Sequence, residues 1–146
     1  MNLSFKTPNT QEFEQIKQFI QEYELDNRVL NAEEFIIAIR DQILVGFGRL
    51  RKHEDCIELC SLGVIANKRR QGIGKEIVCK LIKRAKGKIY LVCIIPDYFI
   101  LFGFKIIKNY PLSIQTKIDY CTNELVVPEK YVAMEVENPL VKLPPS

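Results

Sequence analysis

The sequence predicts an α/β (α+β) chain with a mostly antiparallel sheet, and three features of the apolar pattern predict it. Three apolar runs, over residues 35–39, 43–50 and 56–64, are separated by turn-like residues, as in an antiparallel meander. The apolar period then changes from two to about 3.6 over residues 73–85, which indicates an amphipathic helix. Residues 89–95 are seven consecutive apolar residues, as expected of a strand covered on both faces. A strand, a helix and a second strand in that order form a βαβ unit with parallel strands.

The N-terminal elements are a short strand and an amphipathic helix. A strand over residues 3–6 is followed by Asn9, which can cap a helix, and by Glu12, which completes a capping box. Apolar residues then recur on one helical face up to Tyr23. A short helical or irregular piece near residues 29–33 leads into the meander.

The C-terminal elements are shorter. Pro96 opens a short helical segment that Gly103 ends, and an extended pattern resumes over residues 104–107. A last strand near residues 131–136 is predicted at an edge of the sheet. We therefore expect a single domain over residues 1–142 and a loose tail over residues 143–146.

Composition excludes several classes of protein. With 146 residues, 47% hydrophobic and 27% charged, the chain has the makeup of one globular domain. The net charge of +3 is too small to indicate nucleic acid as a partner. Charged residues interrupt every hydrophobic stretch, so we expect no membrane partner. The N-terminus shows no basic region before a long apolar segment, from which we expect no export signal and a cytoplasmic location.

The cysteines and the single histidine also limit the chemistry. The five cysteines form no C-x-x-C pair, which predicts reduced, packed thiols and no metal site. The sole histidine, His53, lies between Lys52 and Glu54 in a predicted turn. A triad that needs a histidine base therefore has one poorly placed candidate, which also argues against Cys60 as an acyl-carrying nucleophile.

The most informative segment is a strand end followed by a basic loop that opens a helix, over residues 64–75. Free N–H groups and the helix dipole favour an anion at such a helix start. Gly72 and Gly74 leave the backbone unobstructed, and Arg69 and Arg70 add cationic side chains. The segment therefore predicts a diphosphate site.

Two common nucleotide motifs do not fit this segment. A phosphate loop of nucleoside triphosphatases needs G-x-x-x-x-G-K-[ST], but Arg69 stands at the first glycine and Glu76 at the Ser/Thr. The dinucleotide fingerprint G-x-G-x-x-G begins at Gly72 and Gly74, but Ile77 stands at the third glycine. Both motifs are therefore excluded.

The pattern Arg69-x-x-Gly72-x-Gly74, preceded by Leu62-Gly63-Val64, resembles the R/Q-x-x-G-x-G/A signature of the GNAT acyltransferases. The resemblance extends from about Glu58 through Phe104. It implies the GNAT fold, a mixed, mostly antiparallel sheet of about six or seven strands with flanking helices. It also implies that two central parallel strands splay apart and receive the pantetheine of an acyl-coenzyme A.

The resemblance implies a cofactor site for acetyl-CoA at particular positions. Backbone groups at Leu62, Gly63 and Val64 would line the pantetheine, and an N–H near Val64 would stabilise the oxyanion. The pyrophosphate would be held by the amides of Arg69, Arg70, Gln71, Gly72, Ile73, Gly74 and Lys75.

A looser similarity points to N-acetylglutamate synthase-like members of the family. Residues 97–104 are similar to their aromatic segment before Gly-Phe, and residues 117–121 and 132–134 are similar to their C-terminal part. Many GNAT enzymes carry a tyrosine general acid four residues before the glycine, but Phe99 stands there in this chain. The proton donor must therefore be another group.

Acetyl transfer to an amine needs a base for the amine, a donor to the oxyanion and a proton for the departing thiolate. Glu58, which strand alternation groups with Cys60, Leu62 and Val64, is the candidate base. The alternative for Glu58 is a structural role at the rim, paired with Arg49, Arg51 or another cation. The candidate proton donors are Tyr98 and then Tyr120, each with a purely structural alternative, and solvent can also protonate a thiolate.

Three functions follow from these observations. The first is an acetyl-CoA-dependent N-acetyltransferase acting on a primary amine of a small metabolite, with amino acids among the candidates. The second is a CoA-binding sensor or partner-interaction domain that has lost catalysis, as Phe99 suggests. The third, a nucleic-acid module built on the basic helix, is disfavoured by the modest charge. A C-terminal strand exposed at the sheet edge would allow a homodimer.

Overall fold

A computed structural model describes residues 3–137, which fall into two compact units. Within that range, unit 1 comprises residues 3–50 and 59–82, and unit 2 comprises residues 51–58 and 83–137. The loose tail expected over residues 143–146 lies outside the described residues.

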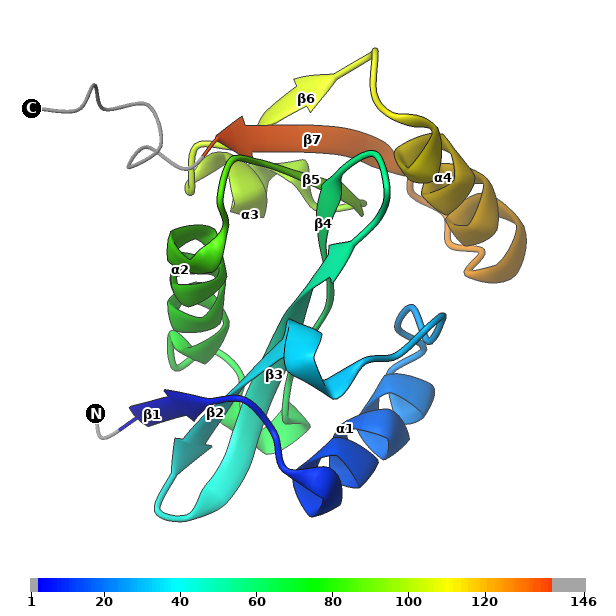
Figure 1. The fold of residues 1–146 in the computed structure, drawn as a ribbon. Coiled ribbons are helices and arrows are strands. Elements are labelled where there is room, and N and C mark those ends of the chain that lie inside the picture. The colour runs from blue at the N-terminus through cyan, green and yellow to red at the C-terminus, as the bar shows by residue number, and fades with distance from the viewer. Residues whose placement is uncertain (1–2, 138–146) are drawn as a thin grey trace, which may run out of the picture. The chain divides into compact units, whose positions relative to one another are not determined.

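Seven strands form a mixed sheet in the order β1-β2-β3-β4-β5-β7-β6 (Figure 1). Strands β4 and β5 are parallel, and the other pairs of known register are antiparallel. This is the mixed, mostly antiparallel sheet with flanking helices that the sequence predicts. The parallel ladder registers two pairs among the described residues, Ile57 with Ile89 and Glu58 with Tyr90.

Unit 1 contains the predicted N-terminal strand and helix and most of the meander. The capping box is present, because Asn9 Oδ1 accepts from the Glu12 amide at 2.8 Å and Glu12 Oε1 accepts from the Asn9 amide at 2.9 Å. The elements lying wholly or mostly in this unit are β1 (Leu3–Lys6), α1 (Thr10–Glu22), the 3₁₀ turn η1 (Ala32–Glu34), β2 (Phe35–Arg40), β3 (Ile43–Lys52), β4 (Ile57–Val64), the 3₁₀ turn η2 (Ala66–Lys68) and α2 (Ile73–Arg84).

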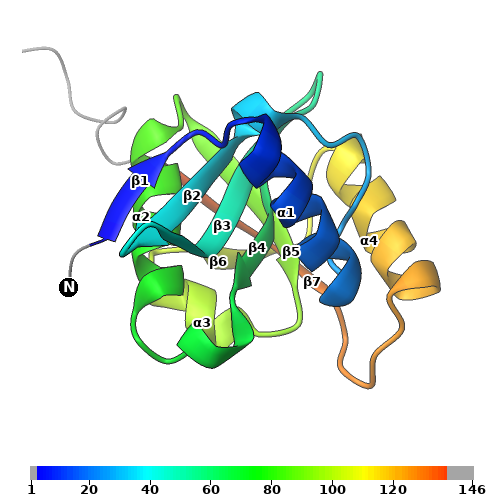
Figure 2. The same ribbon diagram turned by 90° about the horizontal axis from the view of Figure 1, so that it is seen from below.

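Helices α1 and α2 cover opposite faces of the strands in unit 1 (Figure 2). Phe47 of β3 stacks on Phe19 of α1, with 6.3 Å between the ring centroids. The next residue along β3, Gly48, faces α2, because a Cβ there would lie 3.1 Å from both Ile77 and Leu81. Successive residues of a strand point to opposite faces, so glycine on the α2 side lets that helix approach the β3 backbone closely.

Unit 2 is built around the C-terminal strands, and here one prediction was wrong. Its elements are β5 (Lys88–Cys93), α3 (Pro96–Ile100), β6 (Lys105–Ile107), α4 (Leu112–Glu124) and β7 (Val132–Glu137). The sequence predicted the last strand at the sheet edge, but β7 pairs with β5 on one side and β6 on the other. The edge is instead the three-residue strand β6, and Ala133 and Met134 of β7, which pair with β5 and β6, are buried.

Helix α4 was not predicted from the sequence. Its buried residues, Ile114, Lys117 and Cys121, recur at helical spacing, but a lysine stands in the middle of the stripe. Pro111 at the N-cap offers no side-chain hydrogen bond to the helix. The helix contacts β5 and β7. Because Lys117 interrupts the apolar stripe, the sequence pattern alone does not predict this helix.

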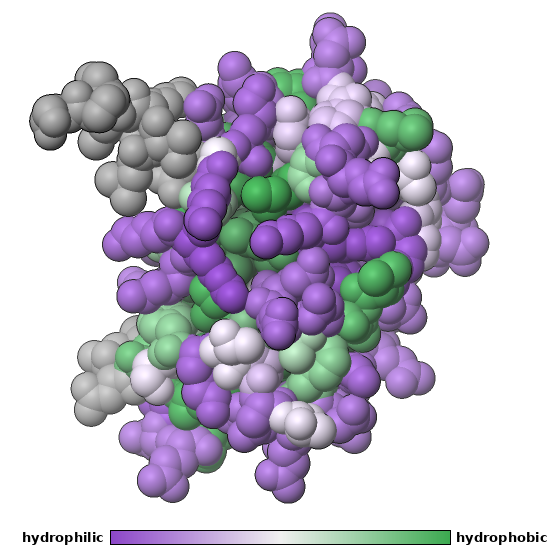
Figure 3. Space-filling view, viewed as in Figure 1, coloured by the Kyte–Doolittle hydropathy of each residue, from purple (hydrophilic) through white to green (hydrophobic). Residues whose placement is uncertain are grey.

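On the face shown in Figure 3, hydrophilic residues predominate and hydrophobic ones are scattered among them. Large apolar side chains that are mostly exposed include Val29, Leu101, Leu112 and Val126. Among the described residues, no helix has the length and apolar character needed to cross a bilayer.

Candidate active site

The loop after β4 in unit 1 opens into α2 with its backbone exposed. Gly72 has φ +80°, and a Cβ built there would meet nothing within 4 Å. The helical hydrogen bond nearest the start of α2 runs from the Glu76 amide to the Gly72 carbonyl, at 3.1 Å. The amides of residues 73–75 precede it and have no acceptor within the helix. A helix start of this kind, with open space above a glycine, fits a diphosphate.

Side chains of unit 1 hold this loop in place. Arg69 Nε donates to the Val64 carbonyl at 3.0 Å, and its guanidinium lies 4.9 Å from the centre of the Tyr23 ring. The Tyr23 hydroxyl accepts from the Ala66 amide at 3.1 Å. Arg69, which the sequence predicts as a cation for the phosphates, therefore also fastens the loop to the end of α1.

The loop also presents positive charge. Arg40 Nη2 donates to Gln71 Oε1 at 2.5 Å, so the Gln71 side chain is already engaged within unit 1. The side chains of Arg70 and Lys75 are exposed. These two side chains are therefore the ones placed to meet an approaching anion.

Strand β4 departs from regular geometry at Ser61, whose φ is +51°. Its hydroxyl donates to the Asp26 carbonyl at 2.8 Å and accepts from Arg49 Nε at 3.1 Å. A left-handed residue inside a strand interrupts side-chain alternation, as in a β-bulge. The predicted grouping of Glu58 and Cys60 with Leu62 and Val64 on one face is therefore wrong.

The break in side-chain alternation at Ser61 sets the directions of the residues that follow it. Leu62 lies on the α2 side, 3.2 Å from where a Gly48 Cβ would stand. A Cβ on Gly63 would come within 2.6 Å of the Phe47 ring on the opposite side, so only glycine fits. The backbone around Leu62, Gly63 and Val64 is thus positioned by packing on both faces.

Arg49 organises the segment between α1 and β2 in unit 1. The side chain is fully buried and donates to the carbonyls of Val29 and Arg28, both at 3.0 Å. Its Nη1 also lies 3.5 Å from a carboxylate oxygen of Glu34. Arg49 therefore holds this segment in place through contacts with Arg28, Val29 and Glu34.

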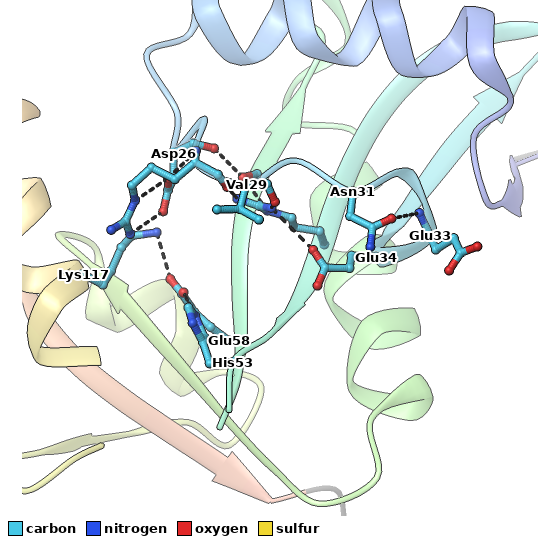
Figure 4. A network of polar contacts seen from close by, with 11 residues as sticks. Asp26, Val29, Asn31, Glu33, Glu34, His53, Glu58 and Lys117 are labelled. Carbon is cyan, nitrogen blue, oxygen red and sulfur yellow. Dashed lines mark hydrogen bonds and ion pairs between the residues drawn. The ribbon is translucent and has the colours of Figure 1, made fainter. Parts of the chain in front are cut away.

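Glu58, the predicted base, is fully buried in unit 2 between two basic side chains (Figure 4). Its Oε1 lies 2.8 Å from His53 Nε2, and its Oε2 lies 2.8 Å from Lys117 Nζ. The side chains of His53 and Lys117 are 12% and 6% exposed. Both Glu58 and Lys117 are thus withdrawn from water, which is tolerated because they are paired.

The hairpin between β3 and β4 brings His53 to Glu58 and is tied to α4. The His53 amide donates to the Cys56 carbonyl at 2.9 Å, which closes the turn. The Ser113 amide at the start of α4 donates to Asp55 Oδ2 at 3.1 Å. Hydrogen bonds from Ser113 hold the pKa of Asp55 below its usual value. Burial, with Asp55 and Glu58 nearby, raises the pKa of Cys56 to about 12, so this thiol stays protonated at neutral pH.

Comparison with known proteins identifies the family. Residues 3–98, well over half of the chain, match the Acetyltransferase (GNAT) family. The chain belongs to the GNAT acetyltransferases. Among curated proteins, no sequence matches it significantly.

Solved structures share the GNAT fold at low sequence identity. N-acetylglutamate synthase from Neisseria gonorrhoeae, complexed with coenzyme A and N-acetyl-glutamate, has a TM-score of 0.72 and 16% identity. The match covers 94% of this chain and 35% of that one, so this chain spans about a third of the synthase.

Two further neighbours match over nearly their whole length. Rv2747 from Mycobacterium tuberculosis, in complex with CoA and a second small molecule, has a TM-score of 0.73 and 18% identity, covering 92% of this chain and 98% of that one. Arabidopsis thaliana Naa50, bound to a bisubstrate analogue of CoA and a peptide, has a TM-score of 0.64 and 19% identity, covering 93% and 99%.

The tyrosines predicted as proton donors lie on two helices of unit 2 in this GNAT chain. Tyr98 is half-buried on α3, where its ring packs against Phe99 and Phe102 at 5.1 and 5.3 Å between centroids. Tyr120 is half-buried on α4, three residues after Lys117. Phe99 is buried and packs on Phe104 at 5.8 Å, so it is a core residue.

Sequence reasoning offered Arg49, Arg51 or another cation as a partner of Glu58 but named neither His53 nor Lys117, which the structure places 2.8 Å from its two oxygens. The signal for His53 was its place five residues before Glu58 across a tight hairpin, where the two side chains can meet. The signal for Lys117 was its position in the weak apolar stripe of α4.

Proposed function

We propose that the chain is an acetyl-CoA-dependent N-acetyltransferase that acetylates a primary amine of a small metabolite. The observation that carries the proposal is the exposed turn at Gly72, which leads into amides at the start of α2 that have no acceptor within the helix. Membership of the GNAT family and the CoA-bound neighbours support the same cofactor. Acetyl-CoA supplies an activated acetyl thioester, so direct transfer needs no covalent intermediate on the protein.

In this proposal each part of the chain has a distinct task. The backbone at Leu62, Gly63 and Val64 lies beside the pantetheine, and Arg70 and Lys75 add positive charge for the phosphates. The amides that hold the pyrophosphate belong to Arg69, Arg70, Gln71, Gly72, Ile73, Gly74 and Lys75. The buried cluster of Glu58, His53 and Lys117 serves to remove the proton from the amine. Tyr98, Tyr120 or solvent protonates the departing thiolate.

An amino acid is the acceptor that the comparisons favour. One neighbour is a synthase of N-acetylglutamate, and another is bound to an analogue that joins CoA to a peptide. Acceptors of both kinds present an α-amino group. We therefore propose free amino acids as the first acceptors to assay, with short peptides as the second.

Substitution of Gly72 tests the cofactor site. Gly72→Val places a branched side chain in the open space of the turn and strains a residue with φ +80°. Gly87→Val is the matched control, because Gly87 also has a positive φ and open space but follows the end of α2. We expect calorimetry to show at least a tenfold loss of CoA affinity for Gly72→Val only. Equal affinity of both variants for CoA would contradict the proposal.

A CoA-binding sensor without catalysis is the second candidate. The observation that favours it is the buried Phe99 at the position where many GNAT enzymes carry a tyrosine acid. Incubation with radiolabelled acetyl-CoA and each of the common amino acids separates the two functions. A labelled amide product supports the enzyme, whereas tight CoA binding with no product from any of these amino acids supports the sensor.

A further inference from the structure

The carboxylate of Glu58 is positioned to orient a neighbour rather than to meet a substrate. It has no exposed surface, and each of its two oxygens already lies 2.8 Å from a basic nitrogen. A general base must come within hydrogen-bond distance of the proton that it removes, directly or through one water. Of the three side chains in the cluster, His53 is the most exposed.

The charges of the cluster fix which nitrogen of His53 can accept a proton. Lys117 faces Glu58 Oε2, and its positive charge favours the ionised carboxylate. An ionised carboxylate only accepts hydrogen bonds, so the proton between His53 and Glu58 belongs to His53 Nε2. In a neutral imidazole with Nε2 protonated, Nδ1 carries the lone pair. Among the described residues, the structure gives no partner to Nδ1.

We infer that His53 is the proton acceptor for the substrate amine, that Glu58 orients it and that Lys117 keeps Glu58 ionised; this inference rests on the proposed function. The N–H bond of the substrate ammonium breaks, the proton bonds to His53 Nδ1, and the electron pair stays on the amine nitrogen. The resulting imidazolium is stabilised by Glu58, 2.8 Å from Nε2. The proton then passes to solvent, which restores the neutral ring.

This assignment gives the α4 helix a role in catalysis that its sequence does not suggest. Lys117 is the residue through which α4 reaches Glu58, and the Asp55–Ser113 hydrogen bond ties the His53 hairpin to the same helix. The base, its orienting carboxylate and the counter-charge thus come from the hairpin, from β4 and from α4. All three lie in unit 2.

The experiment compares two substitutions of His53 in the full chain. His53→Gln retains an amide N–H that can donate to Glu58 but has no group that accepts a proton. His53→Ala leaves space for imidazole added to the solution. Glu54→Gln is the control, because Glu54 is exposed on the same hairpin. Each variant is assayed for CoA affinity by calorimetry and for transfer from radiolabelled acetyl-CoA to the best amino acid acceptor of the wild type.

We expect His53→Gln to lower kcat about a hundredfold or more while CoA affinity stays within a factor of two, and Glu54→Gln to match the wild type. Imidazole is expected to restore a substantial part of the activity of His53→Ala and to leave the wild type unaffected. A fully active His53→Gln, or an inactive His53→Ala that is folded, binds CoA and does not respond to imidazole, would overturn the inference alone. A wild type that binds CoA but acetylates no acceptor would overturn the proposed function, and this inference with it.

Discussion

Glu58 shows how much one buried charge can depend on its neighbours. A carboxylate without exposed surface is costly unless it is paired, and here Lys117 and His53 provide the pairing. The same contacts make Lys117 dependent on Glu58, because this lysine is also buried. The cluster therefore contributes both to stability and to chemistry. A substitution in it must be tested for its effect on the free energy of unfolding and on acetyl transfer.

Removal of one charge of this pair is predicted to cost more than removal of both. Glu58→Gln removes the carboxylate that lies 2.8 Å from the buried Lys117 ammonium, which is expected to lower the free energy of unfolding by about 3 kcal/mol. The double variant Glu58→Gln/Lys117→Met is expected to be more stable than Glu58→Gln alone, since it removes both charges of the buried pair. Urea unfolding of the variants measures both values, with Glu54→Gln expected within about 0.5 kcal/mol of the wild type. Strictly additive losses in the double variant would show that the two charges are not coupled.

The acetyl-transfer activity of Glu58→Gln is a second measurement of the role of Glu58. We expect acetyl transfer to fall, but no further than in His53→Gln, because an amide stabilises the imidazolium less than a carboxylate does while the proton acceptor itself remains. CoA affinity, measured at a temperature where the variant is folded, is expected to stay unchanged.

At the scale of elements, the N-terminus of α4 is capped by a residue from another segment of the chain. Pro111 at its N-cap makes no side-chain cap, and Asp55 from the hairpin accepts the Ser113 amide instead. A carboxylate at a helix N-terminus also interacts favourably with the helix dipole. The hairpin and the helix therefore stabilise each other through one exposed acidic side chain.

This contact predicts a pH-dependent contribution of Asp55 to stability. The pKa of Asp55 is lowered in the folded state, chiefly by hydrogen bonds from Ser113, relative to about 3.9 in the unfolded chain. Its stabilisation is therefore fully present above the unfolded pKa and is lost as the pH falls through the folded pKa. Asp55→Asn, which keeps an acceptor oxygen, is expected to unfold at a lower temperature than the wild type near pH 7. The difference is expected to shrink as the pH falls through the folded-state pKa, and a difference that does not change with pH would rule out the charge as its cause.

At the scale of the whole molecule, the net charge of +3 says little about ligands, whereas its distribution says more. Arg70 and Lys75 are exposed in the loop that leads into α2, while Lys83 and Arg84 stand in the last turn of the same helix. The first pair can meet phosphates, and the second complements the carbonyl end of the helix dipole. Equal charges at the two ends of α2 thus have different roles.

This difference is testable by salt dependence. Arg70→Gln is expected to weaken CoA binding by about 1 kcal/mol at low ionic strength, roughly fivefold, and to make the affinity less sensitive to salt. Lys86→Gln changes the net charge of the chain by the same amount but lies beyond the other end of α2. We expect calorimetry at two salt concentrations to find CoA affinity unchanged in Lys86→Gln. An equal loss in both variants would mean that net charge, rather than the loop, attracts the cofactor.

The sequence by itself determined the elements whose signals are local. The capping box at Asn9 and Glu12, the three apolar runs of the meander, and the helix that follows Gly72 each reveal themselves within a few residues. The signature from Arg69 to Gly74 also identified the family, because a phosphate-binding turn requires particular residues at fixed spacing.

Only the tertiary structure decided which distant segments meet. Strand β7 lies inside the sheet because β6 pairs with its second side, and no pattern within β7 carries that information. The left-handed Ser61 breaks an alternation that its neighbours suggest, because Arg49 and the Asp26 carbonyl bind its hydroxyl. Lys117 faces Glu58 across 59 positions of chain, and the attraction between two buried charges depends on their distance in space rather than along the sequence.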